Sequence, residues 1–126
     1  MGKKCFVLPD MVGRPYSSAV KAGDYIFLSG TIGYVDETGN EVIGIEAQTK
    51  QCLENLKRAL EPLGSSLSDV VKVTVFLIKA EDWVRMNEVY KQYFQVDMPA
   101  RTSVITGLAN PKMLIEIECI AYRPSD

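Results

Sequence analysis

The order in which strand-like and helical segments follow one another most constrains the fold. Runs rich in β-branched and aromatic residues predict strands, and they occupy residues 3–8, 17–21, 25–32, 70–78, 102–108 and 113–122. Residues 45–63 and 81–94 instead repeat apolar side chains with the period of an amphipathic helix. The order β-β-β-α-β-α-β-β predicts an α+β fold with a mixed six-stranded sheet and two helices on one face. No repeat or low-complexity linker interrupts the chain, so one domain is expected over residues 1–126.

The predicted strands have two unlike faces. One face of each strand is apolar, and we expect it to contact the helices. These residues are Ile26, Leu28 and Ile32 in the strand 25–32, Val71, Val73, Val75 and Leu77 in the strand 70–78, and Ile115, Ile117, Cys119 and Ala121 in the strand 113–122. The opposite faces mix apolar and polar side chains: Tyr25, Phe27 and Ser29; Val70, Lys72, Thr74, Phe76 and Ile78; and Leu114, Glu116, Glu118, Ile120 and Tyr122. No predicted helix remains to cover this second face. Its large apolar side chains therefore predict contact with another subunit.

Charge and composition exclude several classes of function. The 14 Lys and Arg and 16 Asp and Glu give a net charge of −2, and the two signs are interspersed, which argues against a nucleic-acid-binding protein. The chain contains no histidine, which excludes His-based catalytic triads and His-containing zinc sites. No apolar run approaches the ~20 residues of a membrane span, and residues 1–8 lack the pattern of a secretory signal. We therefore expect a cytoplasmic protein that does not bind membranes.

The three cysteines predict neither a disulfide framework nor a metal site. Cys5, Cys52 and Cys119 are odd in number and far apart in the sequence. We expect reduced and mostly buried thiols. Glycine-rich phosphate loops are absent, and no lysine stands in a recognisable pyridoxal-phosphate setting. We expect no cofactor and no metal.

Two charged residues are candidates for chemistry. Arg101 begins a predicted strand just after Pro99, and its planar guanidinium matches the two oxygens of a carboxylate. Taken alone, Arg101 is more simply interpreted as a surface or ion-paired residue. Glu116 lies on the uncovered face, where a half-buried carboxylate can orient a water or move a proton. The alternative for Glu116 is a structural ion pair with Lys72, Arg101 or a neighbouring chain.

Further candidates are uncharged. Gly30 follows Ser29 in a strand interior, where glycine often marks a bulge or a close approach to a ligand. No histidine is present to activate Ser29, so we interpret it as a hydrogen-bonding residue and not a nucleophile. Tyr16 is a candidate pocket wall. Asn87, in the second predicted helix, is a candidate hydrogen-bonding residue, although helix capping or solvent contact explains it equally well.

Six ordered motifs together resemble the Rid family, the YjgF-like reactive intermediate deaminases. They are Pro15-Tyr16-Ser17, Ser29-Gly30-Thr31-Ile32, Val71-Lys72-Val73-Thr74-Val75-Phe76, Asn87-Glu88-Val89-Tyr90, Pro99-Ala100-Arg101-Thr102-Ser103 and Ile115-Glu116-Ile117-Glu118-Cys119-Ile120-Ala121. The resemblance implies a chorismate-mutase-like fold and a homotrimer with three ligand clefts between subunits. It implies hydrolysis of 2-imino acids, such as 2-iminobutanoate and 2-iminopropanoate, to 2-oxo acids and ammonia. No metal or cofactor takes part in that reaction.

The resemblance also assigns roles by position. Arg101 matches the arginine that holds the substrate carboxylate, and Glu116 matches the acid that positions the attacking water or moves its proton. The expected cleft residues are Tyr16, Ser29, Gly30 and Asn87. Ser103 stands where many members have a cysteine. Other departures lie around the cleft rim and leave substrate preference open: Arg14, Ser18, Thr31, Gly33 and residues 109–111.

The sequence is also compatible with two other functions. A trimeric protein that binds a small carboxylate, such as a 2-oxo acid, and regulates without catalysis would need Arg101 but not the water-positioning Glu116. The presence of both residues favours the enzyme. A ribonuclease activity is attributed to some relatives, but the acidic balance and the missing histidine count against it.

Overall fold

The computed structural model describes residues 2–124, and it confirms the predicted order of strands and helices. The elements are β1 (Lys4–Phe6), β2 (Ala19–Ala22), β3 (Tyr25–Ile32), α1 (Ile45–Leu60), β4 (Val70–Leu77), α2 (Trp83–Tyr93), β5 (Ala100–Ile105) and β6 (Ile115–Tyr122). Short 3-10 turns extend α1 through residues 61–63 and precede α2 at residues 80–82. Within residues 2–124, no helix is both long and apolar enough to cross a membrane.

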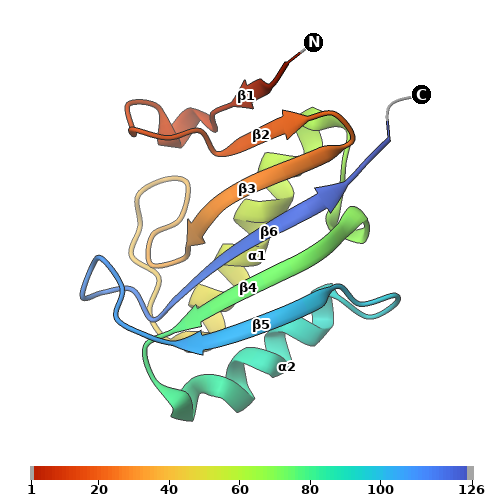
Figure 1. Cartoon of the computed structure of the whole chain (residues 1–126). Coiled ribbons are helices and arrows are strands. Elements are labelled where there is room, and N and C mark those ends of the chain that lie inside the picture. The colour runs from red at the N-terminus through yellow and green to blue at the C-terminus, as the bar shows by residue number, and fades with distance from the viewer. Residues whose placement is uncertain (1, 125–126) are drawn as a thin grey trace.

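The six strands form one mixed sheet in the order β1-β2-β3-β6-β4-β5. Only β4 and β5 run parallel, and α2 makes the crossover between them. All other neighbours are antiparallel. Both helices lie behind the sheet as seen in Figure 1, and the front of the sheet is uncovered. We call this uncovered side the open face.

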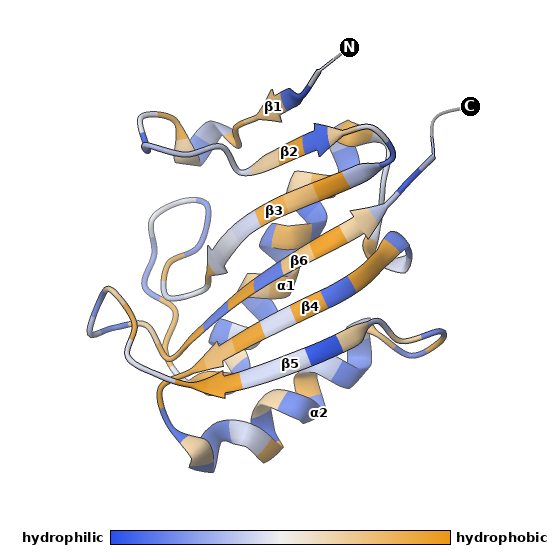
Figure 2. Cartoon of the chain, viewed as in Figure 1, coloured by the Kyte–Doolittle hydropathy of each residue, from blue (hydrophilic) through white to orange (hydrophobic). Residues whose placement is uncertain are grey.

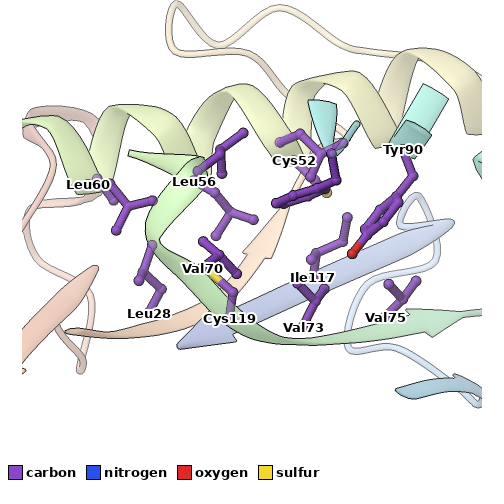
Figure 3. Packing of buried hydrophobic residues seen from close by; sticks show 14 of the residues in the cluster. Leu28, Cys52, Leu56, Leu60, Val70, Val73, Val75, Tyr90, Ile117 and Cys119 are labelled. Carbon is purple, nitrogen blue, oxygen red and sulfur yellow. The ribbon is translucent and has the colours of Figure 1, made fainter. Parts of the chain in front are cut away.

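The hydrophobic core fills the space between the sheet and the helices. Alternate residues of β6, from Ile115 to Ala121, are at most 2% exposed, as the alternation of the sequence predicted. Side chains of α1 and α2 pack onto them (Figure 3): Cys52, Leu56, Leu60 and Tyr90. Full burial of each aliphatic side chain stabilises the fold by about 1.5–3 kcal/mol relative to exposure. The core therefore fixes which face of every central strand points away from the helices.

Two irregularities in strand pairing correct the predicted faces. The pairing of β4 with β6 shifts between Val70 and Lys72, and Val70 is 5% exposed while Val71 is 44% exposed. This is the reverse of the prediction for both residues. The pairing of β3 with β6 shifts between Leu28 and Thr31, so that Ile32 lies opposite Glu116 on the open face and not toward the helices. An inserted bulge residue reverses the facing of the residues beyond it.

The open face retains the apolar side chains that the sequence predicted there. Tyr25, Phe27 and Tyr122 are each more than two-fifths exposed, and their rings form a cluster with centroid separations of 6.5 and 5.2 Å. Figure 2 shows hydrophobic and hydrophilic residues alternating along β4 and β6. Of the cysteines, Cys52 and Cys119 are buried and Cys5 is exposed. Burial raises the pKa of the Cys119 thiol to about 12, so this thiol stays protonated at neutral pH.

Candidate functional site

Glu116 lies in an open groove of about 540 Å³ on the open face. The groove runs between the end of β3, the segment before β2 and the loop that leads into β6. Its walls include the expected site residues Tyr16, Ser29 and Gly30. They also include Arg14 and Asn110, which lie at positions expected around the cleft rim, and three residues that the sequence did not indicate: Ile32, Tyr34 and Met113. We call this the glutamate groove.

The bulge in β3 brings backbone and carboxylate together in this groove. The Ser29 hydroxyl donates to the Ser17 carbonyl at 2.6 Å, and the Thr31 hydroxyl donates to the Ser29 carbonyl at 3.0 Å. These bonds hold the irregular backbone in place. A Cβ atom added at Gly30 would overlap the carboxylate of Glu116. A larger residue at this position would therefore displace the carboxylate, which packs directly against the Gly30 backbone.

The environment of Glu116 suits proton transfer. Burial raises the pKa of its carboxyl, and the negative charge of Glu118 on the same strand raises it further. A carboxylate with a raised pKa accepts a proton more readily than an ordinary glutamate. No ion pair joins Glu116 to Lys72 or Arg101 within residues 2–124. The Lys72 ammonium donates instead to the Thr102 hydroxyl at 2.7 Å, so the structural ion pair considered from the sequence is not formed within the chain.

Arg101 lies between two aromatic rings on the helix side of β5. Its guanidinium carbon is 5.1 Å from the centroid of Trp83 and 4.6 Å from that of Tyr90, both on α2. Such cation–π contacts hold the guanidinium plane without using its N–H donors. No carboxylate of residues 2–124 lies within 4.0 Å of Arg101. The donors needed to bind an anion are therefore not engaged by an ion pair.

Polar groups gather around this arginine. Asn87 lies between Trp83 and Tyr90 on one face of α2, by its helical spacing. Ser103 points to the same side of β5 as Arg101. The buried oxygens Tyr90 Oη and Ser103 Oγ have no hydrogen-bond partner among the described residues. Buried polar atoms of this kind usually have a partner, so the surroundings of Arg101, Asn87 and Ser103 are a candidate site for binding a polar group. We call it the arginine side.

One chain does not bring the two halves of the predicted site together. Arg101 pairs in register with Val73, and Glu116 pairs with Phe76 three residues further along β4. Residues three apart on a strand point to opposite faces, so Arg101 faces the helices and Glu116 faces the open side. Their Cα atoms are separated by roughly 14 Å, from the usual rise per residue and spacing between strands. A small ligand cannot contact both residues of the same chain.

Sequence reasoning missed the residues that hold these side chains. Trp83 and Tyr90 belong to the apolar stripe that predicted α2. That stripe is equally typical of side chains that only pack in a core, so it did not indicate a contact with Arg101. An aromatic pair seven residues apart, facing a strand that begins with arginine, is the signal that would identify them. Tyr34 and Asn110 lie within 3.4 Å of each other across two loops. No local pattern reports a contact between residues so distant in the sequence.

Comparison with known proteins gives consistent results. The family described as Endoribonuclease L-PSP matches residues 10–123. A RutC family protein of Pyrococcus abyssi is 48% identical over 116 residues, which are 91% of each chain. A Dermatophagoides farinae protein named 2-iminobutanoate/2-iminopropanoate deaminase is 38% identical over 113 residues, 89% of this chain and 88% of its own. The crystal structure of RidA from an Antarctic Psychrobacter species has a TM-score of 0.86 at 34% identity, covering 94% of this chain and 99% of that one.

Proposed function

The chain belongs to the endoribonuclease L-PSP family, also called the Rid or YjgF family, and on that basis we propose that it hydrolyses small 2-imino acids to 2-oxo acids and ammonia. Substrates of the size of 2-iminobutanoate and 2-iminopropanoate fit this proposal. The observation that carries it is the combination of a guanidinium held between two rings with a half-buried carboxylate of raised pKa. The first binds a carboxylate, and the second activates water.

The proposed reaction starts from the protonated imine, whose carbon is already electrophilic. Arg101 binds the substrate carboxylate through paired N–H donors. A water placed by Glu116 forms a bond to the imine carbon while the imine electron pair moves to nitrogen. The proton lost by that water passes to the Glu116 carboxylate, which leaves a tetrahedral carbinolamine.

The second half of the reaction expels the amine. Glu116 returns its proton to the amino nitrogen, and the carbon–nitrogen bond breaks as the hydroxyl oxygen forms the new carbonyl. The hydroxyl proton is released to the departing ammonia, so that a 2-oxo acid and ammonium are the products. The first step needs a positioned water, and both steps need a proton carrier. Neither step needs a histidine or a protein nucleophile.

Two features support a site shared between the chains of a homotrimer. Arg101 and Glu116 point to opposite faces within one chain, and the open face exposes an apolar cluster around Phe27. Apolar surface of this kind is normally covered by a partner. In the proposed arrangement the arginine side of one subunit faces the glutamate groove of its neighbour. Three such clefts follow from the threefold symmetry.

The test follows the loss of 2-iminobutanoate, generated from threonine by a dehydratase and trapped with semicarbazide. The wild-type protein should accelerate imine loss. Arg101→Ala should reduce kcat/KM by about 10- to 100-fold, because a charge-assisted hydrogen bond contributes roughly 1.5–3 kcal/mol. Glu116→Gln should abolish most of the acceleration. The matched controls are Arg85→Ala and Glu88→Gln, which remove exposed charges from α2 and should retain activity.

The alternative is a protein that binds 2-oxo acids without catalysis. It would bind 2-oxobutanoate with an affinity that depends on Arg101 and not on Glu116. If the folded oligomer accelerates the loss of none of several 2-imino acids, the deaminase proposal is wrong. Arg101-dependent binding in the same preparation would then support the binding protein.

A further inference from the structure

A second cavity adjoins the glutamate groove on the other side of the β3 bulge. Its volume is about 370 Å³, and it lies between the segment that follows β1, the loop around residues 35–39 and α1. Arg14, Tyr16, Ser29, Gly30 and Ile32 line both the cavity and the groove. A ligand held at Glu116 can therefore extend past Ser29 and Gly30 into this cavity, which we call the side cavity. A four-carbon substrate would leave the side cavity empty.

Two of the three carboxylates in the side cavity are engaged within the chain. Asp10 accepts two hydrogen bonds from Arg58, at 3.1 and 3.2 Å, and this contact lowers its pKa. Asp36 accepts hydrogen bonds at 2.8–2.9 Å from the Thr38 amide, the Thr38 hydroxyl and the Asn40 amide. These contacts balance the charge of Arg58 and fix the loop. They leave these two carboxylates little capacity to bind a cation.

Arg14 differs from Arg58 because no ion pair engages it. Within residues 2–124, no carboxylate lies within 4.0 Å of its guanidinium. Its Nη1 donates one hydrogen bond, to the Tyr16 hydroxyl at 3.3 Å. The third carboxylate of the cavity, Glu37, is exposed and accepts from Gln51 at 3.4 Å. The Arg14 guanidinium therefore lies at the junction of the groove and the side cavity, hydrogen-bonded to the expected site residue Tyr16. No described carboxylate contacts it, and its charge reaches Asp10 only at longer range, where it helps to lower the pKa of that carboxyl.

We infer that Arg14 binds a second carboxylate at the far end of the substrate, so that the preferred imines are those of dicarboxylic amino acids. This inference rests on the proposed deaminase function. The α-carboxylate would bind to Arg101 of a neighbouring subunit, the imine carbon would lie at Glu116, and the side chain would pass Gly30 to reach Arg14. A planar guanidinium binds a carboxylate through two parallel hydrogen bonds. An imine with an alkyl side chain, such as 2-iminobutanoate, has no second carboxylate and gains no binding energy from Arg14.

The test compares substrates within each variant. 2-Iminosuccinate and 2-iminoglutarate are generated by aspartate and glutamate oxidases, and 2-iminobutanoate by threonine dehydratase. We expect the wild-type kcat/KM to be at least tenfold higher for one of the dicarboxylic imines than for 2-iminobutanoate. In Arg14→Gln this ratio should fall about tenfold, as expected for the loss of one charge-assisted contact. Arg14→Lys should keep part of the preference, and the exposed control Arg85→Gln should keep all of it.

Binding of stable products gives a second readout that does not depend on turnover. Calorimetry should show 2-oxoglutarate binding more tightly than 2-oxobutanoate to the wild-type protein and losing that advantage in Arg14→Gln. If 2-iminobutanoate is hydrolysed but the substrate ratio is the same in the wild type and in Arg14→Gln, the role of Arg14 is wrong and the deaminase proposal stands. If no imine is hydrolysed, the deaminase proposal itself is wrong.

Discussion

At the scale of single residues, the arginine side shows how the cation that we propose as the carboxylate-binding group is held without an ion pair. Arg101 is oriented by Trp83 and Tyr90, which leave its N–H donors unpaired by any described carboxylate. An ion pair would hold the guanidinium equally well but would compete with the ligand. Aromatic rings avoid this competition, because they attract the cation through its flat face.

Replacing Trp83 should weaken substrate binding more than it slows chemistry. Trp83→Ala removes one of the two rings, and we expect KM for 2-iminobutanoate to rise about 2- to 30-fold, the range of a cation–π contact of roughly 0.5–2 kcal/mol. The carboxylate contact is the same in the ground state and the transition state, so kcat should change little. Trp83→Phe should restore most of the binding. Steady-state kinetics would contradict this role if kcat fell and KM did not change.

The raised pKa of Glu116 makes a prediction about folding stability. The unfolded carboxyl titrates near its ordinary value of 4.5, whereas the folded one holds its proton to higher pH. The charged form is therefore destabilising in the folded state as the pH rises through the folded pKa, and this effect is absent below both values. Glu116→Gln should have a higher Tm than the wild type at pH 7.

The pH dependence of that difference is the measurement. The gap in Tm between Glu116→Gln and the wild type should close as the pH is lowered to about 4, below the ordinary glutamate range. Glu88→Gln, which removes an exposed carboxylate from α2, provides the control for a general effect of charge. A gap that stayed constant from pH 4 to 8 would show that burial of Glu116 does not couple its titration to folding.

At the scale of elements, the pairing irregularities in β3 and β4 separate what the sequence could predict from what it could not. Strict alternation predicted the buried face of β6, because no irregularity interrupts residues 115–122. The same rule failed at Ile32 and at Val70 and Val71, where a shift in pairing reverses the facing. A single inserted residue leaves the local pattern of apolar side chains almost unchanged. The inserted residue shows only in the pairing with the neighbouring strand. The sequence therefore predicted the strands, but not that Ile32 lies beside Glu116 on the open face.

The bulge should not tolerate a methyl group at its centre. Gly30→Ala would force the Glu116 carboxylate to move, and we expect loss of deaminase activity with only a small loss of stability, because the displaced atoms are the end of a flexible side chain. Gly107→Ala is the matched control, since a Cβ there has no neighbour within 4 Å. Denaturant titration and the imine assay would measure both effects. Full activity in a stable Gly30→Ala protein would contradict the required contact between Gly30 and Glu116.

At the scale of the whole molecule, the open face is where the proposed trimer can be tested. Phe27 is 46% exposed, and its ring centroid lies 6.5 Å from that of Tyr25 in the apolar cluster. Phe27→Lys places a charge there, so the mass in solution should fall from that of three chains to that of one. Ala47→Lys, on the exposed face of α1, should leave the assembly unchanged. Light scattering coupled to size exclusion measures both masses, and a Phe27→Lys protein that remained trimeric would place the interface elsewhere.

In the proposed trimer, the placement of Arg101 and Glu116 on opposite faces of one sheet would allow two inactivated chains to complement each other. Arg101→Ala and Glu116→Gln homotrimers should each have much lower activity than the wild type. When the two variants are unfolded together and refolded as mixed trimers, a cleft that takes its arginine from one chain and its glutamate from the other is intact. With equal amounts and random assembly, roughly a quarter of the clefts are intact, because each cleft draws its two halves independently. Recovery of activity on mixing would thus identify a catalytic unit that no single polypeptide contains.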